Sequence, residues 1–217
     1  MIMRWLLLLL MFSTACVVLA AAETPKKPLL YENTFEKAEL KKVPEDMMVM
    51  EGGWAVIEEG GNKFIELPGA PLETFGVLFG PTESDGISAS ARVFGSGKGR
   101  RFPTFALGLN GVGGYKLQVS PAKKLIELYR GEELLKSVPF QWESETWTVL
   151  RLQSRKVKDG EFAIEGKAWK HGAAEPAQWT ISHTDKTEVP AGRASIWGAR
   201  YSGTPIRFDD LAVTKAG

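Results

Sequence analysis

The sequence predicts an all-β sandwich, and three observations support this fold class. Apolar and polar residues alternate in many short segments, such as 63–67, 88–94 and 115–119, and this period of two sends alternate side chains into a core and outward. Turn-forming residues separate these segments, as at 60–62 and 110–111. Past the N-terminal apolar segment no stretch predicts a helix as strongly, so we expect a sandwich rather than α/β units.

Further strands are expected at 146–152 and 162–169 by the same alternation. The stretch from Tyr115 to Val138 predicts a meander of three strands. Its two turns are expected at 121–124 and 130–132, where Pro and Gly interrupt the pattern. No fixed-period repeat is visible, which argues against solenoids and propellers.

The N-terminus has the three parts of a secretory signal peptide: the charge of Arg4, an apolar run, and small residues ending at Ala22. We therefore predict a signal peptide over 1–22, a linker over 23–28 and a single β-sandwich domain over 29–217. The expected location is extracytoplasmic, periplasmic or secreted, with no membrane insertion after signal removal. Two alternatives stay open: an uncleaved anchor, since the apolar stretch nears spanning length, and lipidation at Cys16.

The composition excludes several kinds of chemistry. Cys16 is the only cysteine and lies in the leader, so the mature chain would have no disulfide, thiolate metal site or cysteine nucleophile. The 27 Lys and Arg nearly balance the 26 Asp and Glu. A balanced chain has no overall field to attract nucleic acid, and we expect no nucleic-acid partner.

No catalytic residues stand out in the sequence. His171 and His183 lack a neighbouring histidine at metal-binding spacing, which disfavours a His-rich zinc site. Glycoside hydrolysis needs two carboxylates across the scissile bond. The nearest pair, Glu143 and Glu145, fits a polar turn before a strand better than a catalytic pair. Whether the protein is an enzyme is left open, with a non-catalytic role favoured.

Aromatic and guanidinium side chains are the candidate ligand contacts, because sugar rings stack on aromatic faces and their hydroxyls accept hydrogen bonds from Arg. In an unbroken strand Trp197 and Tyr201 share one face, with Arg200 on the other. Trp54 and Trp147 alternate with valines and are expected in the core. The predicted ligand-binding residues are Trp197, Arg200, Tyr201, Trp142, Tyr115 and Arg101.

Two of these candidates have an open alternative. Tyr115 and Gln118 point to opposite faces of their strand, so at most one of them faces a ligand. Arg101 belongs to the basic stretch 98–101, which suits either the binding of an acidic glycan or a solvated hairpin tip.

Several segments, taken in order, resemble the concanavalin A-like lectin and glucanase superfamily, including LamG-like and 3-keto-disaccharide hydrolase-type bacterial domains. The segments are 52–60 with its Gly and Trp54, Gly114–Val119 (G-Y-x-x-Q), Trp147–Leu152, Gly192–Trp197 and Phe208–Val213. The sequence departs from that pattern at Glu32-Asn33, where the family has an acidic pair. Neither the N-S-G stretch of the hydrolase-type domains nor the acidic motif of the laminarinase-type glucanases is seen.

The resemblance implies a two-sheet antiparallel jelly-roll sandwich whose ligands lie on a concave face or its rim loops. Some members hold a structural calcium ion between the first and last strands. Asp209 and Asp210 with Glu32 or Asn33 offer oxygen ligands for calcium, although an edge strand with solvated carboxylates is the simpler alternative. No other cofactor is expected.

The resulting expectation is a secreted, lectin-like carbohydrate-binding domain with an oligo- or polysaccharide partner and no evident catalytic pair. Two alternatives remain: a glycan-active hydrolase of the 3-keto-disaccharide type, and a bacterial envelope interaction or scaffold protein.

Overall fold

The computed structural model describes residues 27–70 and 73–216. The predicted signal peptide, with Cys16, lies outside the described residues, as do residues 23–26 of the predicted linker. The regular secondary structure of the described part is nearly all strand, and no helix in it is long and apolar enough to cross a membrane. The strands are β1 Leu29–Asn33, β2 Met48–Val49, β3 Ala55–Glu59, β4 Asn62–Leu67, β5 Thr74–Glu83, β6 Ile87–Gly95, β7 Thr104–Leu109, β8 Tyr115–Ser120, β9 Leu125–Arg130, β10 Glu133–Pro139, β11 Thr148–Lys158, β12 Glu161–Lys170, β13 Ile181–Asp185, β14 Gly192–Ala199 and β15 Ile206–Lys215, and the 3-10 helix η1 spans Pro121–Lys123.

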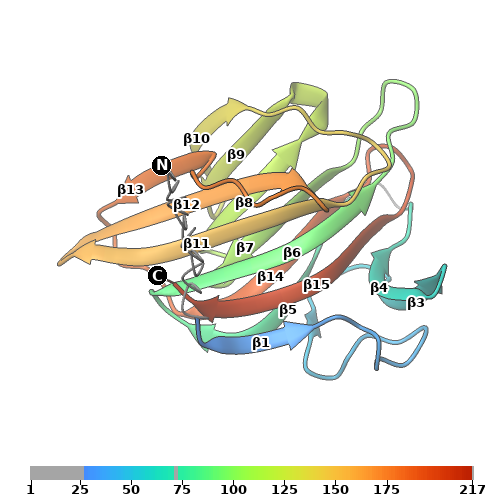
Figure 1. Cartoon of the computed structure of the whole chain (residues 1–217), viewed down its shortest axis with the longest axis horizontal. Helices are drawn as coiled ribbons and strands as arrows, with labels where there is room; N and C mark the ends of the chain where they lie inside the picture. The colour runs from blue at the N-terminus through green and yellow to red at the C-terminus, as the bar shows by residue number, and fades with distance from the viewer. Residues whose placement is uncertain (1–26, 71–72, 217) are drawn as a thin grey trace, which may run out of the picture.

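The strands form two antiparallel sheets that pack face to face (Figure 1). Sheet A has the order β13-β12-β11-β6-β15-β4-β3, with β1 also paired to β15. Sheet B has the order β10-β9-β8-β7-β14-β5-β2. Figure 1 views the molecule with β12, β11, β6 and β15 in front of β7 and β14. The structure confirms the predicted two-sheet antiparallel sandwich.

The core lies between the sheets and is built from the inward-facing residues of each strand. Leu117 and Val119 of β8 and Ile164 of β12 are completely buried. Gly166 of β12 allows the sheets to approach, because a Cβ there would lie 2.5 Å from Leu117 Cδ1. Burial of such apolar surface, at roughly 25 cal/mol per Å², is the main stabilising contribution in a domain whose described residues include no cysteine.

The predicted meander is confirmed as β8, β9 and β10. The turn between β8 and β9 is η1, which ends at Lys124 in the left-handed conformation with a φ of 57°. The Lys124 N–H donates to the carbonyl of Pro121. This tight turn brings Lys123 over the side chain of Glu127, which matters for the site described below.

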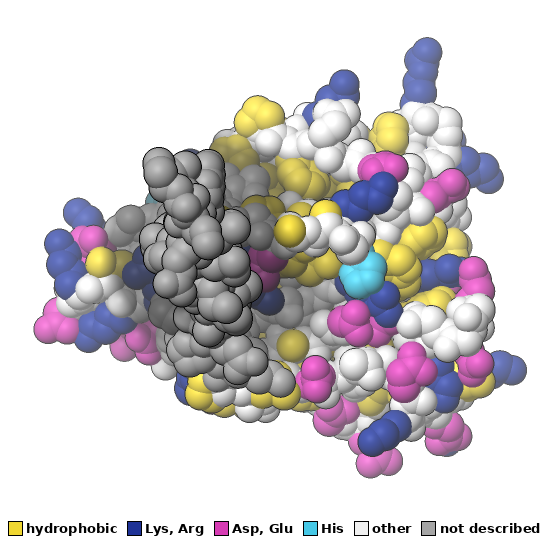
Figure 2. All heavy atoms as spheres, viewed as in Figure 1, with side chains coloured by type: hydrophobic (Ala, Val, Ile, Leu, Met, Phe, Trp, Pro, Cys, Tyr) yellow, Lys and Arg dark blue, Asp and Glu magenta, His cyan; other side chains and the backbone are white. Residues whose placement is uncertain are grey.

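The core prediction is confirmed for Trp54, which is buried, and is wrong for Trp147. Leu150 and Leu152 of β11 point into the core, so Trp147 and the strand's alternate residues face outward from sheet A. Trp147 instead packs beneath the Arg92 guanidinium, whose carbon lies 4.6 Å from the ring centre. Figure 2, which views this face, shows hydrophobic side chains lying among charged side chains of both signs.

Candidate functional site

A hollow of about 230 Å³ lies on the outer face of sheet B, the face turned away from the core. It is floored by β7, β8 and β14. Because Leu117 and Val119 point inward, the alternate residues of β8 point outward into this hollow. Its aromatic, cationic and polar lining residues are Trp197, Tyr201, Phe105, Lys116, Lys123, Thr74, Thr104, Gln118 and Ser120.

The strand register arranges these side chains in rows across the sheet. One row crosses β14, β7, β8 and β9, and consists of Trp197, Ala106, Gln118 and Glu127. The adjacent row consists of Ser195, Gly108, Lys116 and Tyr129. Small residues on β7 therefore separate the Trp197 indole from the polar side chains of β8.

Trp197 is an aromatic side chain that lines the hollow and is partly exposed. Its Nε1–H donates to Ser195 Oγ at 2.8 Å, so the indole's polar atom is satisfied within the protein. Gly76 of β5 lies directly against the ring, because a Cβ on Gly76 would be 2.8 Å from Trp197 Cε3. The indole is thus held in a fixed position before any ligand arrives.

Glu127 is an acidic anchor beside the hollow, only 1% exposed. Its Oε2 accepts hydrogen bonds from Ser120 Oγ at 2.5 Å and Gln118 Nε2 at 3.1 Å. Its Oε1 accepts one from Lys123 Nζ at 3.0 Å. Burial by itself would raise the pKa of the Glu127 carboxyl, but the hydrogen bonds from Ser120, Lys123 and Gln118 outweigh it and lower the pKa. One ionised carboxylate therefore fixes three lining side chains.

Lys116 projects between two aromatic rings of this face. Its Nζ lies 5.4 Å from the centre of the Tyr129 ring and 5.4 Å from the centre of the Trp197 ring. Both distances are within the range of cation–π attraction.

Two of the six predicted ligand residues, Trp197 and Tyr201, line the hollow. Arg200 does not. Its side chain is completely buried, donates to the carbonyls of Pro68 and Ala70, and lies over the Phe75 ring. Burial lowers the pKa of the Arg200 guanidinium. Arg200 therefore ties the segment before β5 to the end of β14.

The other three predicted residues also lie away from the hollow. Tyr115 is in the core, where its hydroxyl donates to Asp185 Oδ2 at 2.8 Å. Trp142 packs edge-on against Phe105, with ring centres 6.0 Å apart. Arg101 is exposed in the loop between β6 and β7, where its backbone pairs with that of Lys98.

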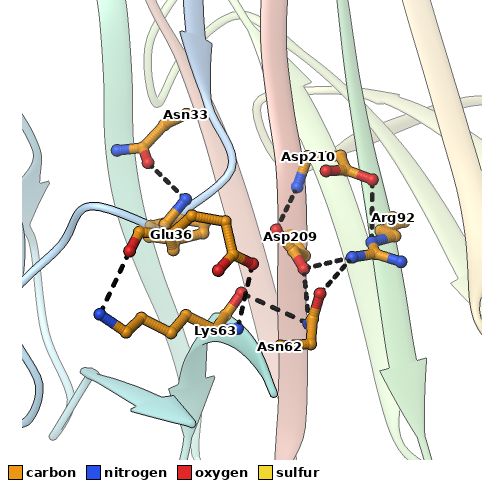
Figure 3. Close-up of polar contacts among 8 residues, drawn as sticks. Asn33, Glu36, Asn62, Lys63, Arg92, Asp209 and Asp210 are labelled. Carbon is orange, nitrogen blue, oxygen red and sulfur yellow. Dashed lines mark hydrogen bonds and ion pairs between the residues drawn. The ribbon is translucent and has the colours of Figure 1, made fainter. Parts of the chain in front are cut away.

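The predicted calcium ligands do not form a cation site (Figure 3). Asp209 Oδ2 accepts hydrogen bonds from Arg92 Nη2 at 2.6 Å and Asn62 Nδ2 at 2.9 Å, and its Oδ1 accepts one from the Asp210 N–H. Asp210 Oδ2 lies 2.9 Å from Arg92 Nε. Within residues 27–70 and 73–216, Glu32 joins no metal-holding group with these aspartates. These residues do not fit calcium, because the Arg92 guanidinium already occupies an oxygen atom of each carboxylate.

Sequence reasoning missed the polar side of the hollow: Lys116, Ser120, Lys123 and Glu127. Gln118 was weighed against Tyr115, and it is Gln118 that faces outward. The signal was present in the alternation of β8, since Lys116, Gln118 and Ser120 share the face opposite Leu117 and Val119. The alternation of β8 does not predict the position of Glu127, because the register between β8 and β9 is what places it beside Gln118.

No carboxylate pair suited to glycoside hydrolysis lies in the hollow, whose lining in the described chain includes neither Asp nor Glu. Glu143 and Glu145 lie in the exposed loop before β11, and Glu143 pairs with Lys170 at 2.9 Å. The polar-turn interpretation of this pair agrees with that placement.

No protein-family model matches the sequence, and no curated protein matches it. Solved structures match the fold. A carbohydrate-binding module, CBM66 from Bacillus subtilis, is 13% identical with a TM-score of 0.55, over 78% of this chain and 96% of that one. A Bacillus subtilis protein of unknown function with a galectin-like fold is 15% identical with a TM-score of 0.61, over 88% and 97%.

The metal-free Emp46p carbohydrate recognition domain is 13% identical with a TM-score of 0.60, covering 88% of this chain and 99% of that domain. At these identities the likeness establishes the fold alone. The described chain shares the two-sheet antiparallel sandwich fold of these structures.

Proposed function

We propose that this protein binds carbohydrate in the hollow on the outer face of sheet B. The observation that carries the proposal is the partly exposed Trp197 indole, fixed by Ser195 and Gly76 and facing the amide and ammonium groups of β8. Two of the similar structures are a carbohydrate-binding module and a carbohydrate recognition domain. Their shared fold supports the proposal.

The hollow offers both kinds of contact that a sugar needs. The C–H face of a sugar ring stacks on the indole, and ring hydroxyls bond to Gln118, Lys116 and Thr104. Because Glu127 already holds Gln118 and Lys123 in place, binding orders few additional side chains, which favours affinity. The volume of about 230 Å³ is below that of a typical drug-sized pocket, roughly 300–1,000 Å³. One ring fits there, with the rest of a glycan lying on the sheet.

A glycan array followed by isothermal titration tests this function. The wild-type protein is compared with Trp197→Ala and with Trp142→Ala, a partly buried tryptophan that does not line the hollow. We expect selective binding that Trp197→Ala weakens at least about tenfold, equivalent to roughly 1.4 kcal/mol. Trp142→Ala is expected to leave the affinity of the folded protein unchanged. Absence of any bound glycan, or equal losses in the two variants, would refute the proposed function.

Export is part of the same proposal. The charged start, apolar run and small-residue exit of residues 1–22 support secretion to an extracytoplasmic compartment, where glycans are accessible. N-terminal sequencing of the protein recovered outside the cytoplasm is expected to begin near Glu23. A chain found in the membrane with its leader intact, or with a lipid on Cys16, would instead favour an anchor.

A further inference from the structure

We infer that the sugar bound in the hollow carries a negative charge, a carboxylate or a sulfate ester, and that Lys116 recognises it. The inference rests on the proposed function and specifies the class of glycan. The charges of the side chains that line the hollow do not cancel.

Two lysines, Lys116 and Lys123, line the hollow, and none of its lining residues in the described chain is acidic. Lys123 is neutralised by Glu127, since their side chains form an ion pair at 3.0 Å. The described residues provide Lys116 with neither an ion pair nor a side-chain hydrogen bond. One positive charge therefore remains uncompensated at the centre of the candidate site.

The position of the Lys116 ammonium is set by the rings on its two sides. Trp197 and Tyr129 each attract it through the negative face of the ring, at 5.4 Å. Cation–π contacts of this kind orient the ammonium without using its three N–H donors. Those donors stay available to oxygen atoms of a ligand that stacks beside them on the Trp197 indole.

An anionic group of a ligand binds the Lys116 ammonium more strongly than a hydroxyl does. A hydrogen bond between an ammonium and a carboxylate or sulfate is roughly twice as strong as one between neutral groups. The formal net charge of the whole chain is only +1, so the overall field of the molecule attracts anions weakly. A preference for acidic glycans would thus come from the hollow itself.

Isothermal titration at about 0.15 M ionic strength tests the inference, since surface electrostatics are screened there. The probes are galacturonan, glucuronan and alginate, each paired with its carboxyl-reduced neutral form, and κ-carrageenan paired with its desulfated form. The proteins are wild type, Lys116→Gln, Trp197→Ala and Lys98→Gln. Lys98 is a matched control because it is exposed in a loop that does not line the hollow.

We expect at least one acidic polymer to bind about tenfold or more tightly than its neutral partner. Lys116→Gln should remove this preference and keep the weaker neutral binding, whereas Lys98→Gln should change neither. A preference for a uronan over its carboxyl-reduced form identifies the anion as a carboxylate. A preference for κ-carrageenan over its desulfated form identifies it as a sulfate.

Three results would overturn the inference. Equal affinity for acidic and neutral partners, lost in Trp197→Ala, would refute the charge preference and leave carbohydrate binding intact. If Lys98→Gln reduces the preference for acidic polymers as much as Lys116→Gln does, the preference arises from general charge attraction and not from the hollow. Absence of binding to all of these polymers would refute the charge preference, and the array decides separately whether a different neutral glycan binds.

Discussion

Tyr115 of sheet B and Asp185 of sheet A join the two sheets by a hydrogen bond, with Tyr115 Oη donating to Asp185 Oδ2 at 2.8 Å. Arg130 Nη1 reaches the same carboxylate oxygen at 2.8 Å, and the Thr187 N–H donates to Oδ1. Burial would raise the pKa of the Asp185 carboxyl, but these donors outweigh it and lower the pKa. The Tyr115 hydroxyl is therefore committed to the fold.

Tyr115→Phe tests that role. We expect a loss of about 1.5 kcal/mol in the free energy of unfolding, because a buried carboxylate loses one donor and keeps the others. Urea titration measures the loss, and glycan affinity of the folded variant should equal that of wild type. A variant of unchanged stability but weakened affinity would place Tyr115 in the binding site after all.

The sandwich and the meander from Tyr115 to Val138 were predictable because alternation and turn residues are local signals. Which face of a strand points into the core was not predictable from the sequence. Trp147 shares a face with Val149, as predicted, but that face lies outside sheet A and is covered by the Arg92 guanidinium. A strand with apolar residues on both faces does not reveal which face packs inward.

The residues that line the hollow were predictable only in part for a similar reason. Trp197 and Tyr201, which line it, are conspicuous in the sequence as aromatic residues. Arg200 lies away from the hollow because it bonds to carbonyls about 130 residues earlier in the chain, a pairing that the local sequence does not indicate. Long-range pairing of this kind, like that between Arg92 and Asp209, leaves no local pattern.

Gly76→Ala is expected to weaken glycan binding without unfolding the protein. The new Cβ would lie 2.5 Å from Met50 Cε and 2.8 Å from Trp197 Cε3, so the Met50 methyl group must move and the indole must tilt out of its position. We expect about a tenfold loss of affinity by titration, or roughly 1.4 kcal/mol. Gly113→Ala is the matched control, since nothing lies within 4 Å of its added Cβ. Equal affinities for the two variants would show that the indole position does not matter.

Glu127→Gln is expected to make stability less dependent on pH in the acid range. The folded-state pKa of Glu127 lies below its ordinary value of 4.5. Its ionised form therefore stabilises the protein above that value, and this stabilisation is lost as the pH falls through the folded-state pKa. The wild type should exceed the variant in unfolding free energy by about 1 kcal/mol near neutral pH, and this difference should shrink as the pH falls through the folded-state pKa of Glu127. Urea titrations from neutral to acid pH measure this difference in unfolding free energy. A difference that widens in acid would contradict the stabilising role of ionised Glu127.

Arg200→Ala is expected to destabilise the protein by about 2 kcal/mol or more, because the carbonyls of Pro68 and Ala70 lose their donor inside the protein. Thermal and urea unfolding measure the effect. Glycan affinity of the fraction that remains folded should be unchanged. A fully stable variant that no longer binds glycan would make Arg200 a ligand contact.

The location of the sugar is tested most directly by nuclear magnetic resonance of the ¹⁵N-labelled tryptophan indoles, titrated with the best glycan from the array. The Trp197 Nε1–H signal, assigned by its absence in Trp197→Phe, is expected to shift in proportion to occupancy, while the Trp142 and Trp147 signals stay in place. A stationary Trp197 signal accompanied by movement of another indole would contradict the account and place the ligand elsewhere on the sandwich.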